Sequence, residues 1–205
     1  MKKFELTNEF VTNMFGTKLF RIRALVEFGD VEAGELGGYV EKESNLGHDD
    51  NAWVYDNAWV YGNAQVSGNA WVCGNAQVSG NAWVYGDAQV SGDARVYDNA
   101  WVYGDAQVSG DARVCGDARV CGNGDYAYAH GFGSVNRTTT FFRLKDGGVG
   151  VRCGCFYGTL AQFRDKIRET HGETKKAQEY LMLADLMELR FEEDENEVGN
   201  RKYVE

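Results

Sequence analysis

The sequence predicts a mainly β protein built around a parallel β-helix, and three observations support this. Twelve consecutive hexads of the form Asn/Asp-Ala-x-Val-x-Gly/Asp run without a break over residues 51–122. Ala and Val stand two positions apart in each hexad, which is the alternation of a strand with one buried face. Gly and then Asn or Asp follow, and these residue types tolerate the backbone angles of a corner. A short period of fixed length is typical of a solenoid.

The hexads also predict which outward side chains lie above one another. If three strands close one triangular coil, 18 residues make a coil, and the repeat makes about four regular coils with a height of roughly 20 Å. Every third hexad then falls on the same face of the solenoid. The first face carries Trp53, Trp71, Gln89 and Gln107, the second Trp59, Gln77, Arg95 and Arg113, and the third Gln65, Trp83, Trp101 and Arg119.

The repeat resembles the hexapeptide-repeat left-handed β-helix family. That family has an aliphatic residue followed four positions later by a small residue, and the pairs from Val54/Ala58 to Val114/Ala118 match this pattern. The resemblance implies a left-handed coil, although ordinary crossover connections are right-handed. It also implies a homo-oligomer, with a trimer favoured, because proteins of this family are typically trimers.

The segments on either side of the hexads predict caps. Residues 1–50 have the pattern of a β-hairpin followed by an irregular lead-in coil, as the open end of a solenoid requires. Residues 123–191 predict a β-hairpin from "TTTFFRL" and "VGVRCGCF", joined by "KDGG", and then two helices. We expect Thr159 to cap a helix that closes at Gly172, and a second helix over 175–190. Residues 192–205 are predicted to be an acidic tail.

Composition limits the classes of partner. The net charge of −10 disfavours nucleic acid and anionic membrane. No signal peptide or membrane span is visible. The five cysteines therefore predict free thiols and a cytoplasmic location. Three of them, Cys73, Cys115 and Cys121, stand where sister hexads have Ser or Tyr, so we expect them at the surface. No metal site or cofactor is expected, because "CGC" has the wrong spacing for a zinc site.

A concentrated aromatic patch is predicted on the third face. It consists of Trp83 and Trp101 beside Tyr85 and Tyr103, while Arg95 and Arg113 stand on the second face. Five outward Trp residues need something to cover them. Subunit packing, a recognition surface, and base stacking assisted by arginines are three alternatives. The repeated Asp residues at the corners leave a fourth, mimicry of a phosphate backbone, although such side chains more often bond their own corner backbone.

A second candidate site follows the repeat. The segment "SVNRTTT", with a base and several hydroxyls, could hold a phosphate together with two later basic residues. The residues of this predicted anion site are Arg137, Thr138, Thr139, Thr140, Lys145 and Arg152. The alternative interpretation is an edge strand, because Thr suits strands.

The whole chain resembles a family of hypothetical proteins common in phages and prophages of Gram-positive bacteria. The matching motifs are "RIRAL…FG…GELGGYVE…NL", a run of hexads, and "TTTFFRLKDG…VRCGCFYGTLAQF…THG". The resemblance implies a phage context in a bacterial host cell and no particular reaction. Because the chain shows no catalytic constellation, we expect from this context a non-enzymatic protein that antagonises host defence, by sequestering a nucleotide-derived signal or by binding a defence protein. A structural oligomer and an acyl-coenzyme A-dependent acyltransferase are alternatives. The acyltransferase is disfavoured because none of the three histidines lies within the hexads.

Overall fold

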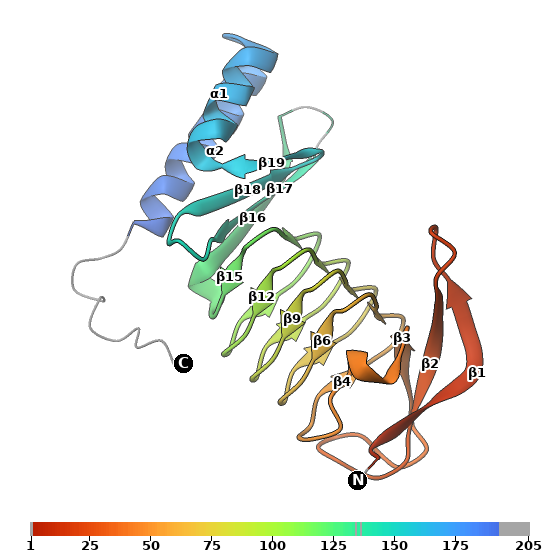
Figure 1. Ribbon diagram of the computed structural model, residues 1–205. Helices are drawn as coiled ribbons and strands as arrows, with labels where there is room; N and C mark the ends of the chain where they lie inside the picture. Colours follow the sequence, from red (N-terminus) through yellow and green to blue (C-terminus); the bar gives the residue numbers. More distant parts are fainter. Residues whose placement is uncertain (1, 134, 136, 193–205) are drawn as a thin grey trace.

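The hexads form a parallel β-solenoid with a sheet at each end. The computed structural model describes residues 2–133, 135 and 137–192. A β-hairpin lies at the N-terminal end of the solenoid, and a small sheet with two helices lies at the other end (Figure 1). The chain is therefore mainly β, as the repeat predicts.

Each hexad contributes one two-residue strand and one corner. The strands are β4 (Trp53–Val54), β5 (Trp59–Val60), β6 (Gln65–Val66), β7 (Trp71–Val72), β8 (Gln77–Val78), β9 (Trp83–Val84), β10 (Gln89–Val90), β11 (Arg95–Val96), β12 (Trp101–Val102), β13 (Gln107–Val108), β14 (Arg113–Val114) and β15 (Arg119–Val120). Their parallel sheets run in the orders β4-β7-β10-β13, β5-β8-β11-β14 and β6-β9-β12-β15. Partners such as Trp83 and Trp101 are 18 residues apart, so the predicted assignment of residues to three faces is confirmed.

The interior of the solenoid consists of the Ala and Val of the hexads. All of these side chains from Ala52 to Val120 have no exposed surface. Ala and Val are small enough to fill a narrow triangular interior, and burying them removes apolar surface from water. This requirement explains why these two positions never vary while the residue between them does.

The corners use the sixth and first positions of the hexad differently. Except in the last hexad, the sixth residue turns the chain with a positive φ, between 63° and 71° in the glycines and 52° or 61° where Asp56 or Asp98 replaces glycine. Gly122, which ends the last hexad, is extended with φ of −162°. The first residue forms a ladder along the solenoid, in which Asn63 donates to Asn81 and Asn81 donates to Asn99. We expected these side chains to bond their own corner backbone. They bond their counterparts one coil away instead, because the stacking places like residues within reach.

The N-terminal cap extends one face of the solenoid. Strands β1 (Phe4–Thr12) and β2 (Lys18–Ala24) form the expected hairpin, and β3 (Leu36–Val40) pairs antiparallel with β2 and parallel with β5. A short 3₁₀ helix, η1 (Glu43–Asn45), follows. The cap covers Trp53, which has no exposed surface and touches the rings of Phe4 and Phe28. Our expectation of five outward Trp residues is therefore wrong for Trp53.

The C-terminal part has more strands than the sequence predicts. The short 3₁₀ helix η2 (Asn123–Asp125) precedes β16 (Tyr126–Phe132), β17 (Arg137–Arg143), β18 (Val149–Cys153) and β19 (Phe156–Thr159), which form an antiparallel sheet in chain order. The β17–β18 hairpin is confirmed, but β16 and β19 were not expected. Gly154, with φ of 58°, makes the tight turn that returns the chain from β18 to β19. The acidic tail lies outside the described residues from 193 onwards.

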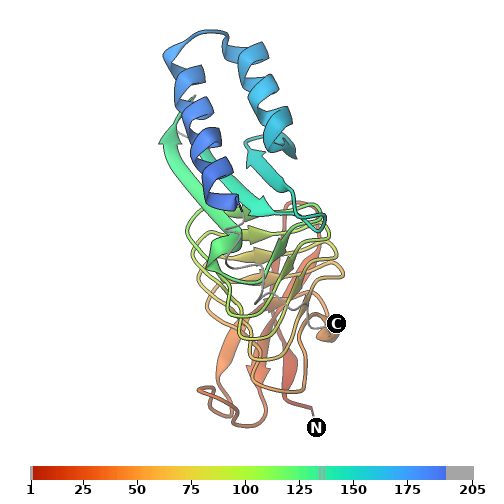
Figure 2. The ribbon, with the colours of Figure 1, turned by 90° about the vertical axis from the view of Figure 1, so that its left-hand side faces the viewer.

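Two helices cover one face of this sheet (Figure 2). Helix α1 (Leu160–His171) begins after Thr159, whose hydroxyl accepts from the N–H of Gln162, and ends at Gly172. Helix α2 is Lys175–Phe191, and both helices agree with the prediction. Phe141 and Phe163 belong to the core beneath the helices. The next residue of β17, Phe142, belongs to the core of the solenoid, so this strand joins the two cores.

Candidate functional site

The predicted anion site is not assembled as one cluster, because the residues of β17 alternate between two sides. Thr139 faces the helices and its hydroxyl contacts the Cys153 sulfur, while Thr140 faces the solenoid and accepts from the N–H of Arg113. Both threonines are buried, so their hydroxyls make contacts inside the protein and stabilise the fold. Thr138 contacts His130 Nδ1 at 2.9 Å, and Arg137 lies exposed over the turn at Gly154. Ser134 and Asn136 of the same motif lie outside the described residues.

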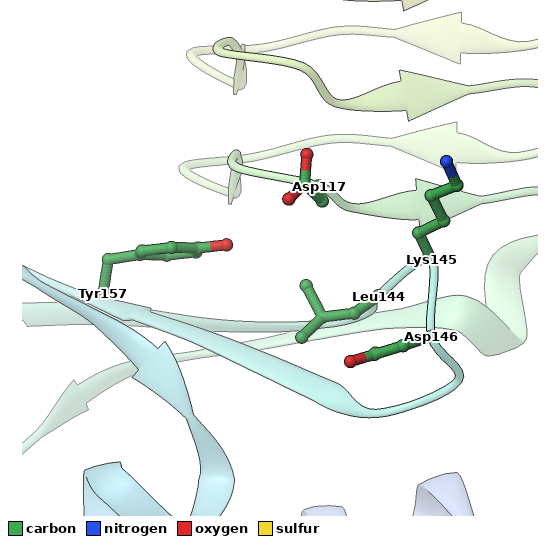
Figure 3. Close-up of a pocket in the computed structure, with 5 residues that line it drawn as sticks. All are labelled: Asp117, Leu144, Lys145, Asp146 and Tyr157. Carbon is green, nitrogen blue, oxygen red and sulfur yellow. The ribbon is translucent and has the colours of Figure 1, made fainter.

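Lys145 lines a different pocket, of about 390 Å³, at the junction of the solenoid and the C-terminal sheet. Figure 3 shows it between Asp117 of the last coil, the β17–β18 turn and Tyr157, whose hydroxyl points towards Asp117. Asp117 and Asp146 place two carboxylates around the single ammonium of Lys145. This balance of charge does not favour an anion, and Lys145 lines a different pocket from Arg152.

Arg152 instead joins two arginines of the solenoid. Its strand, β18, runs beside β17 with Arg152 opposite Thr140, so its side chain extends towards the second face. There it meets Arg95 and Arg113, which are neighbours on β11 and β14. The three arginines line a pocket of about 260 Å³, which we call the three-arginine pocket. The other lining residues are Tyr61, Gln77, Ser79 and Tyr97.

The guanidinium groups of this pocket form no ion pair with any carboxylate in the part of the chain that the structure describes. Among the residues that the structure describes, none of Arg95, Arg113 and Arg152 forms a salt bridge or a side-chain hydrogen bond. The Nε atom of Arg152 is buried and has no hydrogen-bond partner within the same residues. A buried donor without an acceptor is costly. Only Arg152 has such a buried donor, while Arg95 is exposed and Arg113 is half-buried. Three guanidinium groups without a salt bridge around one cavity nevertheless form a site that an anion with several oxygens would complete.

Tyr97 of the pocket remains a neutral donor. Burial raises the pKa of Tyr97, and its hydrogen bond with Cys115 adds to this effect. The Arg152 guanidinium lies 5.9 Å from the centroid of the Tyr97 ring. Cys115 is 1% exposed, so our expectation of a surface position is wrong, because the residues of the C-terminal part cover it. Burial raises the pKa of its thiol although Arg152 opposes the effect, which makes this cysteine a poor nucleophile.

The aromatic patch of the third face is a stacked ladder. The Trp83 and Trp101 rings lie 5.2 Å apart at 8°, and the Tyr85 and Tyr103 rings lie 5.2 Å apart at 5°. The Arg119 guanidinium covers the far side of Trp101 at 4.2 Å from the ring centroid. Trp83 is 42% exposed. The predicted juxtaposition of these four rings is confirmed, and the ladder is separate from the three-arginine pocket because it occupies another face.

One histidine has partners that the sequence did not reveal. His130 Nδ1 lies 2.9 Å from the Thr138 hydroxyl and 3.9 Å from Asp111 Oδ2. These contacts arise because β16 pairs with β17 beside the solenoid corner at Asp111. The described part of the chain has no group of three or more His, Cys, Asp or Glu residues placed to hold a metal ion. Within the same part, no helix is long and apolar enough to cross a membrane.

The fold defines a parallel β-solenoid protein, and a comparison with protein families agrees. A family model described as the YdcK beta solenoid repeat matches residues 76–90, 88–104 and 106–122. These stretches lie in the hexads and include Arg95 and Arg113, but they leave out both ends and Arg152. A comparison with curated proteins gave no match. The similarity therefore concerns the repeat.

Proposed function

We propose that this chain is a non-enzymatic binding protein that sequesters a small nucleotide-derived anion in the three-arginine pocket. The observation that carries the proposal is the convergence of three guanidinium groups that form no salt bridge among the described residues, one of which has a buried Nε without an acceptor. Arg95 and Arg113, one strand spacing apart, suit the oxygens of a phosphate, and Arg152 approaches from the C-terminal sheet. Tyr61 and Tyr97 supply rings on which a base could stack.

The resemblance of the whole chain to phage and prophage proteins suggests what such capture would serve. Host defence that signals through nucleotides would be antagonised by a protein that removes the signal without converting it. Sequestration requires affinity and stoichiometric amounts, and the lining residues supply positive charge and hydrogen bonds for this purpose. The proposal therefore includes a cytoplasmic location in the host cell.

Isothermal titration calorimetry with cyclic mono- and dinucleotides and ADP-ribose derivatives tests the proposal. We expect one class to bind, to be recovered unchanged by chromatography, and to lose at least about tenfold in affinity with Arg113→Ala or Arg152→Ala. Arg137→Ala is the matched control, because Arg137 belongs to the sequence-predicted site and not to the pocket. Loss of binding with Arg137→Ala alone, conversion of the ligand, or no binding of any compound would overturn the proposal.

A second candidate function is direct binding of a host defence protein through the aromatic ladder. The exposed surface of Trp83 at one end of a rigid stack favours it, because aromatic side chains anchor protein interfaces. The same ladder could instead pack between subunits of a homo-oligomer, such as a trimer. Light scattering after size exclusion separates these alternatives. A trimer that dissociates with Trp83→Ala would assign the ladder to subunit packing, while a monomer would favour the host protein.

A further inference from the structure

A pocket of opposite character lies on the first face, near the N-terminal cap. It has a volume of about 250 Å³ and is bounded on one side by the loop at Gly29 and on the other by β7 and β10. The remaining lining residues are Asp30, Asn51, Tyr55, Asn69, Trp71, Asp87 and Gln89. Among the described residues, no lysine or arginine lines it. This aromatic–carboxylate pocket is therefore independent of the three-arginine pocket in position and in charge.

Trp71 provides an apolar wall that the fold leaves uncovered. The preceding Trp53 of the same row is fully buried by the cap, whereas Trp71 is 37% exposed. The Tyr55 ring meets Trp71 edge-on, with centroids 6.1 Å apart and an angle of 72°. This contact packs the tyrosine against the indole. A partly exposed indole with an adjacent tyrosine can attract cations to the faces of the aromatic rings.

Two carboxylates give the pocket a negative potential. Asp30 has no hydrogen bond or salt bridge among the described residues, and Asp87 uses Oδ1 to accept from Asn69 at 2.9 Å. Asn51 donates to Asn69 in the same ladder, so the amides are already oriented. Burial and the nearby Glu35 and Asp30 carboxylates raise the pKa of Tyr55, which is consistent with a negative field. An anion is disfavoured in such a pocket.

We propose that the aromatic–carboxylate pocket binds an organic cation, with an alkylammonium group packed on Trp71 and with Asp30 and Asp87 as its counter-charges. The volume suits a head group of a few carbon atoms. Cation–π attraction and two exposed carboxylates act together, so affinity decreases as salt concentration rises. A neutral sugar would use the same ring and amides without using the charges, and the experiment distinguishes these ligands.

Titration calorimetry with choline and with its uncharged analogue 3,3-dimethyl-1-butanol tests the proposal. We expect millimolar or tighter binding of choline and no binding of the analogue. Trp71→Ala and the double variant Asp30→Asn/Asp87→Asn should each lower the affinity at least about tenfold, while Trp71→Phe should retain part of it. Trp83→Ala is the matched control, because Trp83 is similarly exposed on another face.

Three results would overturn the proposal. They are equal binding of the alcohol, binding of glucose without choline, and full affinity in a folded Trp71→Ala variant. Circular dichroism establishes the folding of each variant. If Trp71→Ala does not fold, the Asp30→Asn/Asp87→Asn variant decides, since both side chains are polar and lie at the surface. Absence of choline binding would not contradict the proposed function of the three-arginine pocket, because Arg113→Ala and Arg152→Ala report on that pocket alone.

Discussion

The Thr140 hydroxyl accepts a hydrogen bond of 2.9 Å from the backbone N–H of Arg113. In the preceding coil the equivalent N–H, of Arg95, donates to the Ala112 carbonyl. Thr140 thus supplies the acceptor for this N–H at the end of the solenoid, where no further coil follows to supply a carbonyl. Asn123 and Asp125 accept in the same way from Gln107 and Cys121. Because every coil donates towards the C-terminal end, this end needs acceptors and the N-terminal end needs donors.

Thr140→Val should therefore destabilise the chain by about 1–3 kcal/mol, since it leaves a buried N–H without an acceptor. Valine keeps the shape of the side chain and removes only the hydroxyl. The free energy of unfolding in urea measures the effect. Thr138→Val is the control, because the Thr138 hydroxyl contacts the exposed His130, and we expect a change within about 0.5 kcal/mol. Equal effects of the two variants would contradict this role of Thr140.

Lys3 performs the complementary task at the N-terminal end, and its stability contribution depends on pH. Its ammonium donates to the Ala52 carbonyl at 2.9 Å and the side chain is buried. Burial lowers the pKa of Lys3 from 10.5 to about 8, although Asp50 and Asp49 oppose the effect. Between pH 8 and 10.5 the unfolded chain therefore binds more protons at this site than the folded chain. Stability from this site rises with pH over that interval.

Lys3→Met should remove that rise. The free energy of unfolding of the parent protein minus that of the variant is expected to increase from pH 8 to pH 10.5, because only the parent protein gains stability over this interval. Lys2→Met serves as the control because Lys2 is exposed and pairs with Glu43 at the surface. A difference that stays constant, or that shrinks as the pH rises, would show that burial does not set the pKa of Lys3.

Gly86 tests the requirement for glycine at the corners. Its φ is 71°, and a Cβ added there would lie 3.1 Å from the backbone nitrogen of Gly104 in the next coil. Gly86→Ala should cost about 1–3 kcal/mol from backbone strain and crowding. Gly124→Ala should be nearly neutral, since a Cβ there meets nothing within 4 Å. Thermal unfolding of both variants compares them directly, and a stable Gly86→Ala would show that the coils can separate locally.

The sequence predicted the solenoid in detail because the repeat has no insertion. An unbroken period of six fixes which residues face inward and which strands neighbour each other, so Trp83 and Trp101 could be paired without coordinates. The helices were predicted equally well, since Thr159 and Gly172 mark the ends of α1. Local signals sufficed in both cases.

The three-arginine pocket was predicted only in part, because its residues come from different elements. Arg95 and Arg113 could be placed together by the period. Arg152 was grouped with Arg137 because of their distance along the chain, although the register of the β17–β18 hairpin sets Arg152 opposite Thr140. Extending the strand alternation from Phe142 to Thr140 would have placed Arg152 on the solenoid side. That inference needs knowledge of which core contains Phe142, which is a tertiary contact.

Trp53 and Cys115 were misplaced for the same physical reason. Both stand at outward positions of the hexad, and both are buried because a cap covers one end of a face. The repeat describes the middle of the solenoid and carries no information on where a cap lies. The contacts of Trp53 with Phe4 and Phe28 involve residues far away in the chain.

Arg152 provides a test that separates a binding role from a structural one. Its Nε is buried without a hydrogen-bond partner among the described residues, so the ligand-free protein retains a buried donor that no acceptor satisfies. Arg152→Met keeps an unbranched apolar stem over Tyr97 and removes the charge. We expect the free energy of unfolding of the variant to exceed that of the parent protein by about 0.5–2 kcal/mol when no ligand is present. A residue kept for binding should show this exchange of stability for affinity.

The same variant should gain nothing from an anionic ligand. A ligand at 100 times its dissociation constant stabilises the parent protein by about 2.7 kcal/mol, and Arg152→Met should lose most of this effect. Thermal unfolding with and without the nucleotide identified by calorimetry measures both quantities in one experiment. A less stable Arg152→Met that still responds fully to the ligand would assign Arg152 to the packing between Tyr97 and the C-terminal sheet. A more stable Arg152→Met that no longer responds to the ligand would assign Arg152 to binding of the anion.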